Sequence, residues 1–408
     1  MTHSNKDTPS IRFAGFTDAW KQRKLDDLIK ENLKPVPKPE GEYTRLGIRS
    51  HAKGTFHEVV AQGEGLNVDT MYVVEANNLI VNITFAWEEA WAITTEKDAE
   101  KLVSHRFPQY CFNQDQCPMF YQYRFRNGQM KYNLELASPG GAGRNRVLNK
   151  TEFMKIPVTI PKSYEEQKEI GIFFSRLDDI ITLHKRKCDA LQKFKKSMLQ
   201  KMFPQNGESV PEIRFAGFTD AWEQRKVGEW GYFYYGHSCP KWSVTEDATT
   251  PCIRYGEMYT KFGCKIDRVY SYTNIPKDQL KFSKGTEVLV PRVGEDPMDY
   301  NHCTWLSLAN IAIGEMISVY NTEQNPLFTA IMFNATLKYE FAKRVEGGSV
   351  TNLYYEKLLE IPVSFPNIEE QKKIASFFEN IESLITLHQR KLETLQKMKK
   401  SLLQKMFV

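Results

Sequence analysis

Apolar residues recur three and four positions apart in two long stretches of the chain, residues 165–203 and 369–407. This spacing places one stripe of side chains along a helix, and a stripe of this length is typical of a coiled-coil seam. The expected seam residues are Ile170, Phe173, Leu177, Ile180, His184, Cys188, Leu191, Met198 and Met202, matched by Ile374, Phe377, Ile381, Leu384, His388, Leu392, Leu395, Leu402 and Met406. Each stretch begins with two glutamates and gathers Lys and Arg in its C-terminal half, as the helix dipole favours. The pattern predicts two helices, each about 58 Å long.

His184 and His388 occupy equivalent positions in these helices, each within the letters "TLH". Imidazole is a common metal ligand and a pH-sensitive group, so a metal or pH-sensing pair is one interpretation. No second ligand lies within helical reach of either histidine. We favour the other interpretation, a partly buried polar residue that fixes the register of a long seam.

The two helical stretches are also copies of one another. Aligned at an offset of 204, 24 of their 39 positions are identical. A second repeat precedes each copy, because "IRFAGFTDAW" stands unchanged at residues 11–20 and 213–222. Internal repeats of this kind indicate a duplicated unit about half the chain in length.

The segments between these repeats have a mixed pattern and differ strongly from each other. Short β-rich runs such as "NLIVNITFAW", "TEVLVP", "IAIGEMISVY" and "FTAIMFNA" alternate with polar loops, which indicates α/β domains. Only short and weak sequence similarities relate the two segments, among them "IPVTIP" at 156–161 and "IPVSFP" at 361–366. A repeated frame around two different interiors suggests one partner-binding task performed twice and two different recognition tasks.

Composition narrows the class of protein without naming a partner. The chain has 408 residues, with 55 Lys plus Arg against 50 Asp plus Glu, a formal charge of +5. Its seven cysteines are odd in number and show no C-x-x-C spacing, which argues against a disulfide framework and a zinc site. No signal peptide or run of about 18 apolar residues is present. We expect a soluble protein in a reducing cytoplasm, with no membrane partner.

The chain resembles the specificity subunits of type I restriction-modification systems. The resemblance rests on the tandem organisation, on residues 347–378 and 140–174, and on the basic helices that end in "QKMF". It implies a mixed α+β fold, in which two α/β target-recognition domains are separated by two long antiparallel helices that form a coiled coil with pseudo-twofold symmetry. The implied domains are target-recognition domain 1 at 1–162, helical spacer 1 at 163–204, target-recognition domain 2 at 205–366 and helical spacer 2 at 367–408.

The resemblance also implies a role and partners. Each target-recognition domain would read one half of a bipartite site in double-stranded DNA, and the helices would set the gap and dock two methyltransferase subunits. Restriction subunits would join in the full complex. The chain itself would hold no cofactor: S-adenosylmethionine is expected on the methyltransferase partner, and ATP and Mg on the restriction partner.

Two structural expectations follow from the repeats. If the second helix packs along the first in the opposite direction, Val408 comes close to Ser10, as residue 203 is close to residue 213 at the first junction. The repeated decapeptide then acts as an aromatic lock that seats each domain against the helices. Its members are Phe13, Phe16 and Trp20 in the first copy and Phe215, Phe218 and Trp222 in the second.

An enzyme is the main rival class, but the chain lacks the motifs that the relevant enzymes need. "FAGFT" ends in Thr where the cofactor loop of adenosylmethionine-dependent methyltransferases needs Gly, and "DPMDY" at Asp296 lacks the second Pro of a target-amine loop. No G-x-x-x-x-G-K-S/T phosphate loop occurs. We therefore predict a non-catalytic subunit. The alternatives are a self-sufficient DNA modification enzyme and a coiled-coil adaptor that binds proteins.

The α/β segments carry basic residues suited to DNA contact. Arg can pair bidentately with guanine, and Lys or Arg can hold phosphates without reading sequence. The predicted DNA-binding residues are Arg45, Arg49, Lys53, Arg144, Arg146, Lys241, Trp242, Arg254 and Arg292. His51 lies in the same stretch as the first three. No catalytic residue and no metal ligand is predicted.

Overall fold

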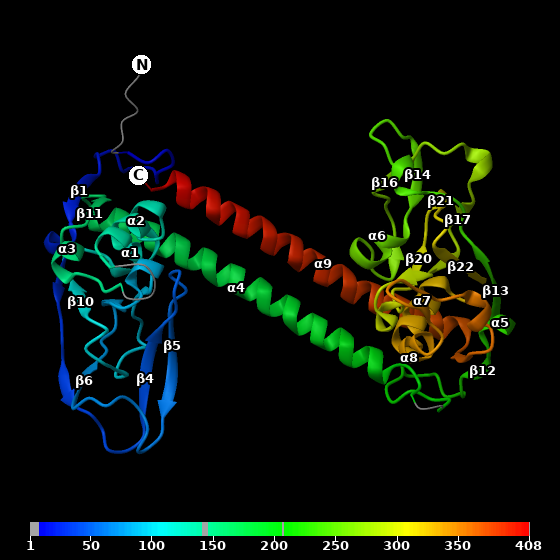
Figure 1. The fold of residues 1–408 in the computed structure, drawn as a ribbon, viewed down its shortest axis with the longest axis horizontal. Coiled ribbons are helices and arrows are strands. Elements are labelled where there is room, and N and C mark those ends of the chain that lie inside the picture. Colours follow the sequence, from blue (N-terminus) through cyan, green and yellow to red (C-terminus); the bar gives the residue numbers. More distant parts are fainter. Residues whose placement is uncertain (1–7, 141–145, 206–207, 408) are drawn as a thin grey trace. The chain divides into compact units, whose positions relative to one another are not determined.

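A computed structural model describes residues 8–140, 146–205 and 208–407 of the chain. The chain divides into two compact units. Unit 1 is Met1–Lys185 together with Arg390–Val408, and unit 2 is Arg186–Gln389. Each unit therefore contains one α/β domain, the first part of one long helix and the last part of the other (Figure 1).

The α/β domain of unit 1 is built on small, mostly antiparallel sheets. Its strands are β1 (Lys21–Lys24), β2 (Ile29–Glu31), β3 (Pro35–Pro37), β4 (Tyr43–Ile48), β5 (Thr55–Val60), β6 (Thr70–Val73), β7 (Leu79–Val81), β8 (Trp91–Ile93), β9 (Leu102–Val103), β10 (Gln109–Phe112) and β11 (Pro157–Ile160). They are ordered β3-β6-β9-β4-β5, β2-β10-β7-β8 and β1-β11. The short helices are α1 (Pro118–Arg124), α2 (Gly128–Leu136) and α3 (Lys150–Met154).

The α/β domain of unit 2 has a different sheet arrangement. Its elements are β12 (Glu223–Lys226), α5 (Val227–Trp230), β13 (Gly231–Tyr235), β14 (Thr250–Ile253), α6 (Tyr255–Thr260), β15 (Lys265–Ile266), β16 (Ser271–Thr273), β17 (Phe282–Lys284), β18 (Glu287–Pro291), β19 (Val293–Gly294), β20 (Thr304–Leu306), β21 (Ala309–Ile313), β22 (Ile317–Thr322), α7 (Pro326–Thr336), α8 (Lys338–Ala342), β23 (Glu346–Gly347), β24 (Thr351–Asn352) and β25 (Pro362–Phe365). The sheet orders are β13-β22-β18-β20-β15, β16-β14-β21-β17, β19-β24-β23 and β12-β25. The mixed α/β character expected of both segments is confirmed.

Two of the expected β-rich runs take other conformations. "FTAIMFNA" lies inside helix α7, because the Asn325 side chain accepts a hydrogen bond from the backbone N–H of Phe328 and Pro326 occupies the first helical turn. An Asn cap followed by Pro favours a helix start over a strand. "NLIVNITFAW" forms only the three residues of β7 before the chain turns into a short 3-10 helix, Ala86–Glu88.

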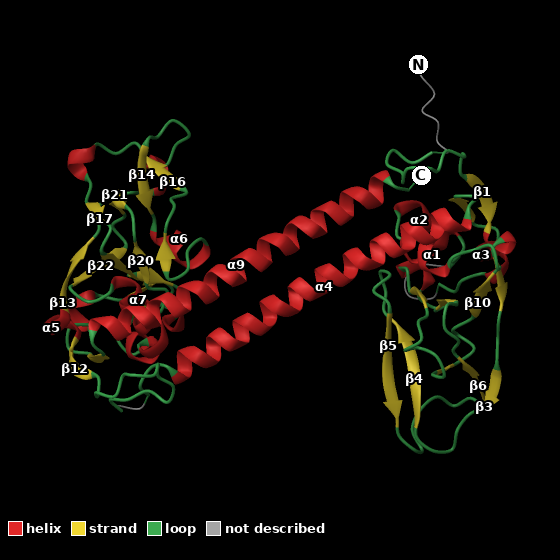
Figure 2. Cartoon of the chain, turned by 180° about the vertical axis from the view of Figure 1, so that it is seen from behind, coloured by secondary structure: helices red, strands yellow, loops and turns green. Residues whose placement is uncertain are grey.

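The two predicted long helices are present as α4 (Tyr164–Lys201) and α9 (Ile368–Lys405), each of 38 residues. Figure 2 shows how they stand out from the short helices of both domains, the longest of which, among the described residues, is α7 with 11 residues. No helix within the described ranges is long and apolar enough to cross a membrane.

The helix segments within each unit run antiparallel. In unit 1, Asp178 of α4 pairs with Lys399 of α9, and the Phe174 and Phe407 rings lie 5.7 Å apart. Earlier residues of α4 therefore lie beside later residues of α9. Unit 2 repeats the arrangement with the helices exchanged. There Lys195 of α4 pairs with Glu382 of α9, and the Phe203 and Phe378 rings lie 6.0 Å apart.

The buried face of the helices differs from the expected seam at one turn. Ile180 and Leu384 were expected inside, but they are 44% and 46% exposed. Their neighbours Ile181 and Ile385 pack on the hydrophobic cores instead. In each unit, the first part of the long helix packs on the α/β domain as well as on the other helix. The buried face of the helix is therefore rotated from the expected seam towards the domain. His184 and His388 are partly buried, as expected.

A buried ion pair joins each decapeptide to a long helix. In unit 1, Arg12 donates from Nε and Nη2 to the two carboxylate oxygens of Glu166, at 2.6 and 2.7 Å. In unit 2, Arg214 contacts Glu370 with the same atoms and the same two distances. The carboxylate side chains are 1% and 0% exposed. Two parallel N–H···O bonds fix both the distance and the plane of each contact.

An aromatic cluster lies beside each ion pair, and it includes the predicted lock. Trp20 contacts Phe120 and Phe407, at 6.0 and 6.2 Å between ring centroids, and all three side chains pack in one core. The equivalent rings of unit 2 are Trp222, Phe328 and Phe203, with centroid separations of 5.6 to 6.0 Å. Phe13 and Phe215 each pack edge-on against the helix-borne Phe173 and Phe377, at 5.7 and 5.9 Å. The aromatic lock is confirmed for these members.

A buried glutamine completes the repeated contacts between each long helix and its domain. We call this set of contacts the frame: the Arg–Glu ion pair, the aromatic cluster and the glutamine. The side chain of Gln167 accepts from the backbone N–H of Cys117, directly before α1, and donates to the Pro161 carbonyl. Gln371 accepts from the N–H of Asn325, directly before α7, and donates to the Pro366 carbonyl. The letters "EEQ" at the start of each long helix thus specify two contacts. Glu binds the decapeptide, and Gln binds the start of a domain helix.

The C-terminal end of α9 lies where the first junction predicts. The backbone N–H of Ile11 donates to the Lys405 carbonyl at 3.0 Å, and that of Ile213 donates to the Lys201 carbonyl at 2.9 Å. Val408 itself lies outside the described residues, but the proximity of the C-terminal end of α9 to the first decapeptide is confirmed. Both decapeptides turn at a glycine with positive φ, Gly15 at 96° and Gly217 at 93°, where an L side chain is strained.

The ion pair predicts a large loss of stability when one partner is removed. We expect Arg214→Ala to lower the free energy of unfolding of unit 2 by about 3–5 kcal/mol, because it leaves the Glu370 carboxylate buried and unpaired. Urea denaturation checks this value. The matched control is Arg268→Ala, whose ion pair with Asp267 is solvent-exposed and should contribute less than about 1 kcal/mol. Equal losses from the two variants would contradict a frame held by the buried pair.

Candidate nucleic-acid interface

The predicted DNA-binding residues fall on two sites, one in each α/β domain. Those of the first domain are Arg45, Arg49, Lys53 and Arg146, and those of the second are Lys241, Trp242, Arg254 and Arg292. Arg144 lies outside the described residues. The structure brings some of each set together and engages others in contacts within the protein.

The first site is organised by the turn between β4 and β5. His51 and Ala52 in this turn have φ of 61° and 49°, and Glu89, which follows the 3-10 helix Ala86–Glu88, has φ of 58°. Left-handed backbone at residues other than Gly is strained and persists only where other contacts hold it. Here the N–H groups of His51 and Ala52 donate to the carbonyls of Glu88 and Glu89, at 2.7 and 2.9 Å. The turn is therefore fixed against the 3-10 helix.

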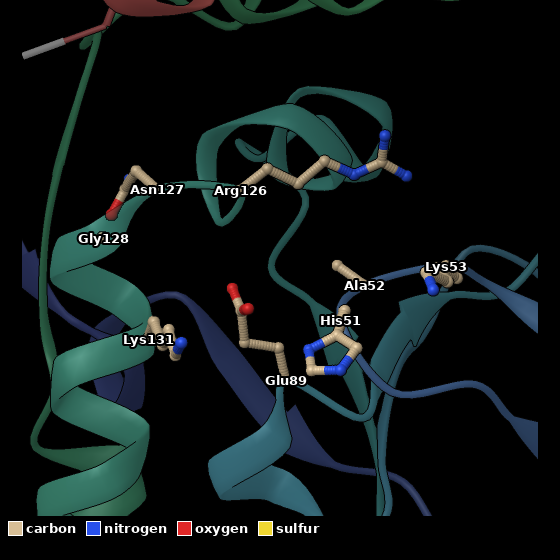
Figure 3. Close-up of a pocket in the computed structure, with 8 residues that line it drawn as sticks. All are labelled: His51, Ala52, Lys53, Glu89, Arg126, Asn127, Gly128 and Lys131. Atoms are coloured by element: carbon tan, nitrogen blue, oxygen red, sulfur yellow. The ribbon is translucent and has the colours of Figure 1, made fainter.

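A pocket of about 650 Å³ opens where this turn faces the start of α2 (Figure 3). Its lining residues are His51, Ala52, Lys53, Glu89, Arg126, Asn127, Gly128 and Lys131. Figure 3 shows Glu89 directed into the space between Lys131 and the turn that carries His51. Two lysines, one arginine and one histidine against a single carboxylate make the wall basic, which suits an anion such as a DNA phosphate.

Arg126 and Lys131 did not emerge from the sequence analysis. Their signal in the sequence is the run "FRNGQMK", in which an Asn-Gly step between basic residues starts a helix. The Asn127 side chain caps α2 by accepting from the N–H of Met130 at 2.8 Å. A helix start flanked by cations is a general anion-binding arrangement, and only the fold shows that it faces the β4–β5 turn.

The other predicted residues of the first domain make contacts within the protein. Arg45 pairs with Glu58 across the hairpin at 2.6 Å, so its charge is already matched. Arg49 donates to the Thr55 carbonyl and lies over the Phe56 ring, 5.0 Å from the ring centroid. The guanidinium of Arg146 lies 5.3 Å from the centre of the Trp87 ring, on the 3-10 helix beside the pocket. Lys53 and Arg146 thus converge on this region, and Arg45 does not.

A buried carboxylate anchors β5. Asp98 is 2% exposed and accepts hydrogen bonds from the Thr55 hydroxyl at 2.7 Å, from the Thr95 N–H and hydroxyl at 2.8 Å each, and from the His57 ring at 2.9 Å. Burial by itself raises the pKa of Asp98, but these hydrogen bonds outweigh it, so the pKa of this carboxyl lies below its ordinary value. The hairpin that carries Arg49 and Lys53 is held in place through this group.

The second site surrounds the turn between β21 and β22. Gly314 in this turn donates its N–H to the Ile253 carbonyl at 3.0 Å, next to Arg254. The carbonyl of Met316, at the end of the turn, accepts from the N–H of Arg292 at 3.3 Å. A Cβ at Gly236 would lie 2.1 Å from the Gly314 carbonyl oxygen, so only glycine permits this close approach. The turn thus bonds to the end of β14, next to Arg254, and to Arg292 after β18, strands that belong to two different sheets.

Two tyrosine rings flank the Arg292 guanidinium. Its central carbon lies 4.4 Å from the Tyr235 ring centroid and 5.4 Å from that of Tyr354. The Tyr235 hydroxyl donates to Glu356 at 2.7 Å. Burial and the neighbouring Glu356 raise the pKa of Tyr235 above its ordinary value. The hydroxyl therefore remains protonated at neutral pH, and the ring stays tied in place.

Lys241 and Trp242 lie in the 3-10 helix Lys241–Ser243, which follows the loop that leaves β13. Trp242 is 71% exposed, a large apolar side chain left in contact with solvent. Within the described ranges, no group of three or more His, Cys, Asp or Glu side chains is placed to hold a metal ion. The side chains that both sites offer to a ligand are thus mainly cationic and aromatic.

Comparison with known proteins connects this arrangement to a family. The type I restriction modification DNA specificity domain matches residues 18–193 and 308–397, most of the chain. The chain belongs to this family. The matched residues include both long helices over most of their length and the domain elements that dock on them.

Two relatives carry names that agree with the family, and a solved structure shares the fold. A putative type I restriction enzyme specificity subunit of Methanocaldococcus jannaschii, MjaX, is 26% identical over 266 residues, covering 63% of this chain and 59% of that protein. The MjaVIII specificity subunit of the same organism is 23% identical over 310 residues, covering 69% of this chain and 68% of that subunit. The alignment with MjaX thus spans less than two thirds of its length. The crystal structure of a type I S subunit from M. genitalium shares the fold, with a TM-score of 0.60 at 12% identity over 98% of this chain and 99% of that one.

Asp98 predicts an acid-sensitive site. Because its folded-state pKa is depressed, its carboxylate stabilises the fold above the unfolded pKa of about 3.9, and this contribution is lost as the pH falls through the folded pKa. We expect Asp98→Asn to lower the free energy of unfolding of unit 1 by about 1–3 kcal/mol at pH 7. The difference from the unsubstituted chain should shrink below about pH 4. Urea denaturation at pH 7 and pH 3.5 measures both values. Asp189→Asn, an exposed helix position, is the control and should change neither value.

Proposed function

We propose that this chain is the DNA sequence-recognition subunit of a type I restriction-modification complex and has no catalytic activity of its own. Each α/β domain reads one half of a bipartite target in double-stranded DNA. The helices α4 and α9 set the gap between the halves and dock two methyltransferase subunits. Restriction subunits join in the full complex, and a cytoplasmic location belongs to this proposal.

The observation that carries the proposal is an identical frame around two different domains. The Arg–Glu pairs, the Trp–Phe–Phe clusters and the buried glutamines recur with nearly the same geometry in units 1 and 2. The domains held by these contacts differ in sheet order and in the side chains of their basic sites. A frame kept constant supports a common partner, and different interiors support two different DNA half-sites.

The cofactors of the complex are assigned to its other subunits. S-adenosylmethionine belongs to the methyltransferase partner, and ATP and Mg belong to the restriction partner. Membership of a DNA specificity family favours this reading over a self-sufficient modification enzyme. It equally favours DNA over a protein ligand for the α/β domains, against the adaptor alternative.

The helices offer an equivalent apolar surface in each unit. Ile180 and Leu183, three residues apart on one face of α4, are 44% and 51% exposed. At the same positions of the repeat, Leu384 and Leu387 of α9 are both 46% exposed. Exposed aliphatic pairs on a helix suit the apolar face of a partner helix. Their duplication supports two copies of one methyltransferase subunit.

Exchange of one domain tests the proposed recognition. We replace residues 25–155, between β1 and β11, with the corresponding segment of another family member in cells that express the complete system. Because the decapeptides, the "EEQ" sequences and both long helices remain, and the inserted segment brings its own domain helix to them, one half of the methylated sequence should change and the other half should persist, as read by methylome sequencing. The reciprocal control replaces residues 227–361, between β12 and β25, and should change the opposite half. Changes in both halves from either exchange would show that recognition is not divided between the domains. A separate assay of the purified chain tests the absence of catalytic activity, because methyl transfer by the chain alone would show that it is an enzyme.

The proposed docking face predicts a partner-specific defect. Leu183→Ser and Leu387→Ser remove the apolar contact at one position in each unit, and each should weaken methyltransferase binding by roughly tenfold. Titration calorimetry with the purified methyltransferase subunit measures the affinity. Lys193→Ser and Lys397→Ser, exposed on the same helices, are the controls. If the lysine variants weakened binding as much as the leucine variants, the apolar face would not be the docking surface.

A further inference from the structure

Arg292 is held more rigidly than an ordinary surface arginine. It follows β18 directly, and its backbone is fixed on both sides, by the bond to the Met316 carbonyl and by its own carbonyl, which accepts from the N–H of Leu353 at 2.8 Å. The rings of Tyr235 and Tyr354 lie within 5.4 Å of its guanidinium. Stacking on aromatic faces fixes the plane of a guanidinium and reduces the entropy lost when it binds a ligand.

The hydrogen-bonding capacity of this guanidinium is largely unused. Nε is buried and has no partner among the described residues. Nη1 makes one long contact, 3.5 Å to the Glu315 carbonyl. Within the same part of the chain, no carboxylate lies within ion-pair distance of Arg292, and the nearby Glu356 accepts from Tyr235 instead. Nη2 donates to no described residue, so the Nη end of the guanidinium is available to an acceptor outside the chain.

Two ligands of DNA match a planar fork of N–H groups. One is a phosphate, whose oxygens accept bidentate bonds, and the other is the N7 and O6 edge of guanine in the major groove. Glu356 lies at the end of the Tyr235 ring, and its negative charge opposes a phosphate at this place. A guanine edge is neutral and needs two donors in one fixed plane. The Arg292 guanidinium supplies the donors, and the two tyrosine rings fix its plane.

We propose that Arg292 reads one guanine in the half-site bound by the second α/β domain, with Tyr235 and Tyr354 as positioning residues. This inference rests on the proposed function and adds a base and a residue to it. The guanidinium donates to N7 and O6 of the base, and the tyrosine rings keep its plane in line with the base edge.

Substitution by lysine tests the fork, because it keeps the charge and removes the bidentate geometry. The full chain, in complex with its methyltransferase subunits, is assayed against a DNA library in which each position of the half-site is varied. For Arg292→Lys, we expect preference for guanine at one position to fall by roughly 5- to 150-fold, the range of one bidentate base contact. Preferences at the other positions should persist.

The ring of Tyr354 supplies a second, milder test, which remains available if Arg292→Lys fails to fold. Tyr354→Leu removes the stacking surface and should reduce preference for guanine at that same position. Tyr354→Phe keeps the ring and should leave the preference unchanged. Thermal unfolding of each variant checks that the domain remains folded.

Three results would overturn the inference. One is an unchanged preference for guanine in Arg292→Lys. Another is uniform weakening on all sequences, with the slope of log affinity against log salt reduced by about 1, which identifies a phosphate contact. The third is an equal loss from Tyr354→Phe and Tyr354→Leu, because the ring would then have no positioning role. If the unsubstituted complex shows no sequence preference at all, the proposed function itself fails, and this outcome is distinguishable from the other three.

Discussion

The structure depends on a carboxylate buried at the start of each long helix. Glu166 and Glu370 have almost no contact with water, so each needs a cation of fixed geometry, which the decapeptide arginine provides. That pairing explains why the decapeptide is written twice without change. Its Trp must also fit between a domain helix and the C-terminal end of the other long helix. A substitution of the arginine, Phe13 or Phe215, or the tryptophan in either copy would disturb the ion pair or the ring contacts, whereas most residues of the domains, outside α1 and α7, touch neither.

This constraint separates assembly from recognition. The frame contacts involve the decapeptide, the "EEQ" sequence, the Phe near each helix end and one domain helix, and they leave most of each α/β domain unconstrained. The β4–β5 turn of the first domain and the β21–β22 turn of the second lie outside the frame. Side chains there can change without loss of the frame, which is the physical condition for a recognition protein that acquires new targets while it keeps its partners.

The two candidate interfaces use different means to place their cations. In the first domain, strained backbone at His51, Ala52 and Glu89 is held by hydrogen bonds to a 3-10 helix, and it shapes a positive pocket. In the second domain, aromatic rings fix a single arginine. A pocket lined by several cations suits the DNA backbone, and a stacked fork suits a base edge. The domains therefore differ in the kind of contact they offer as well as in sequence.

The sequence by itself determined the long helices, the duplicated frame and the docking role of the aromatic residues, because periodicity, identity between copies and helix-dipole signals are local properties of the chain. It also singled out Lys53, Arg254 and Arg292, which the structure places at the β4–β5 turn and beside the β21–β22 turn; their contact with DNA stays a prediction. It did not reveal that "QCP" before α1 and "QNP" before α7 are equivalent, since the Gln167 and Gln371 contacts that relate them cross about 50 residues. The sequence also did not predict that Ile180 is exposed, that Arg45 pairs with Glu58, or that Arg126 and Lys131 lie near the β4–β5 turn. Those outcomes depend on which segments the sheets and helices bring into contact, and contacts between distant segments are decided only when the whole domain packs.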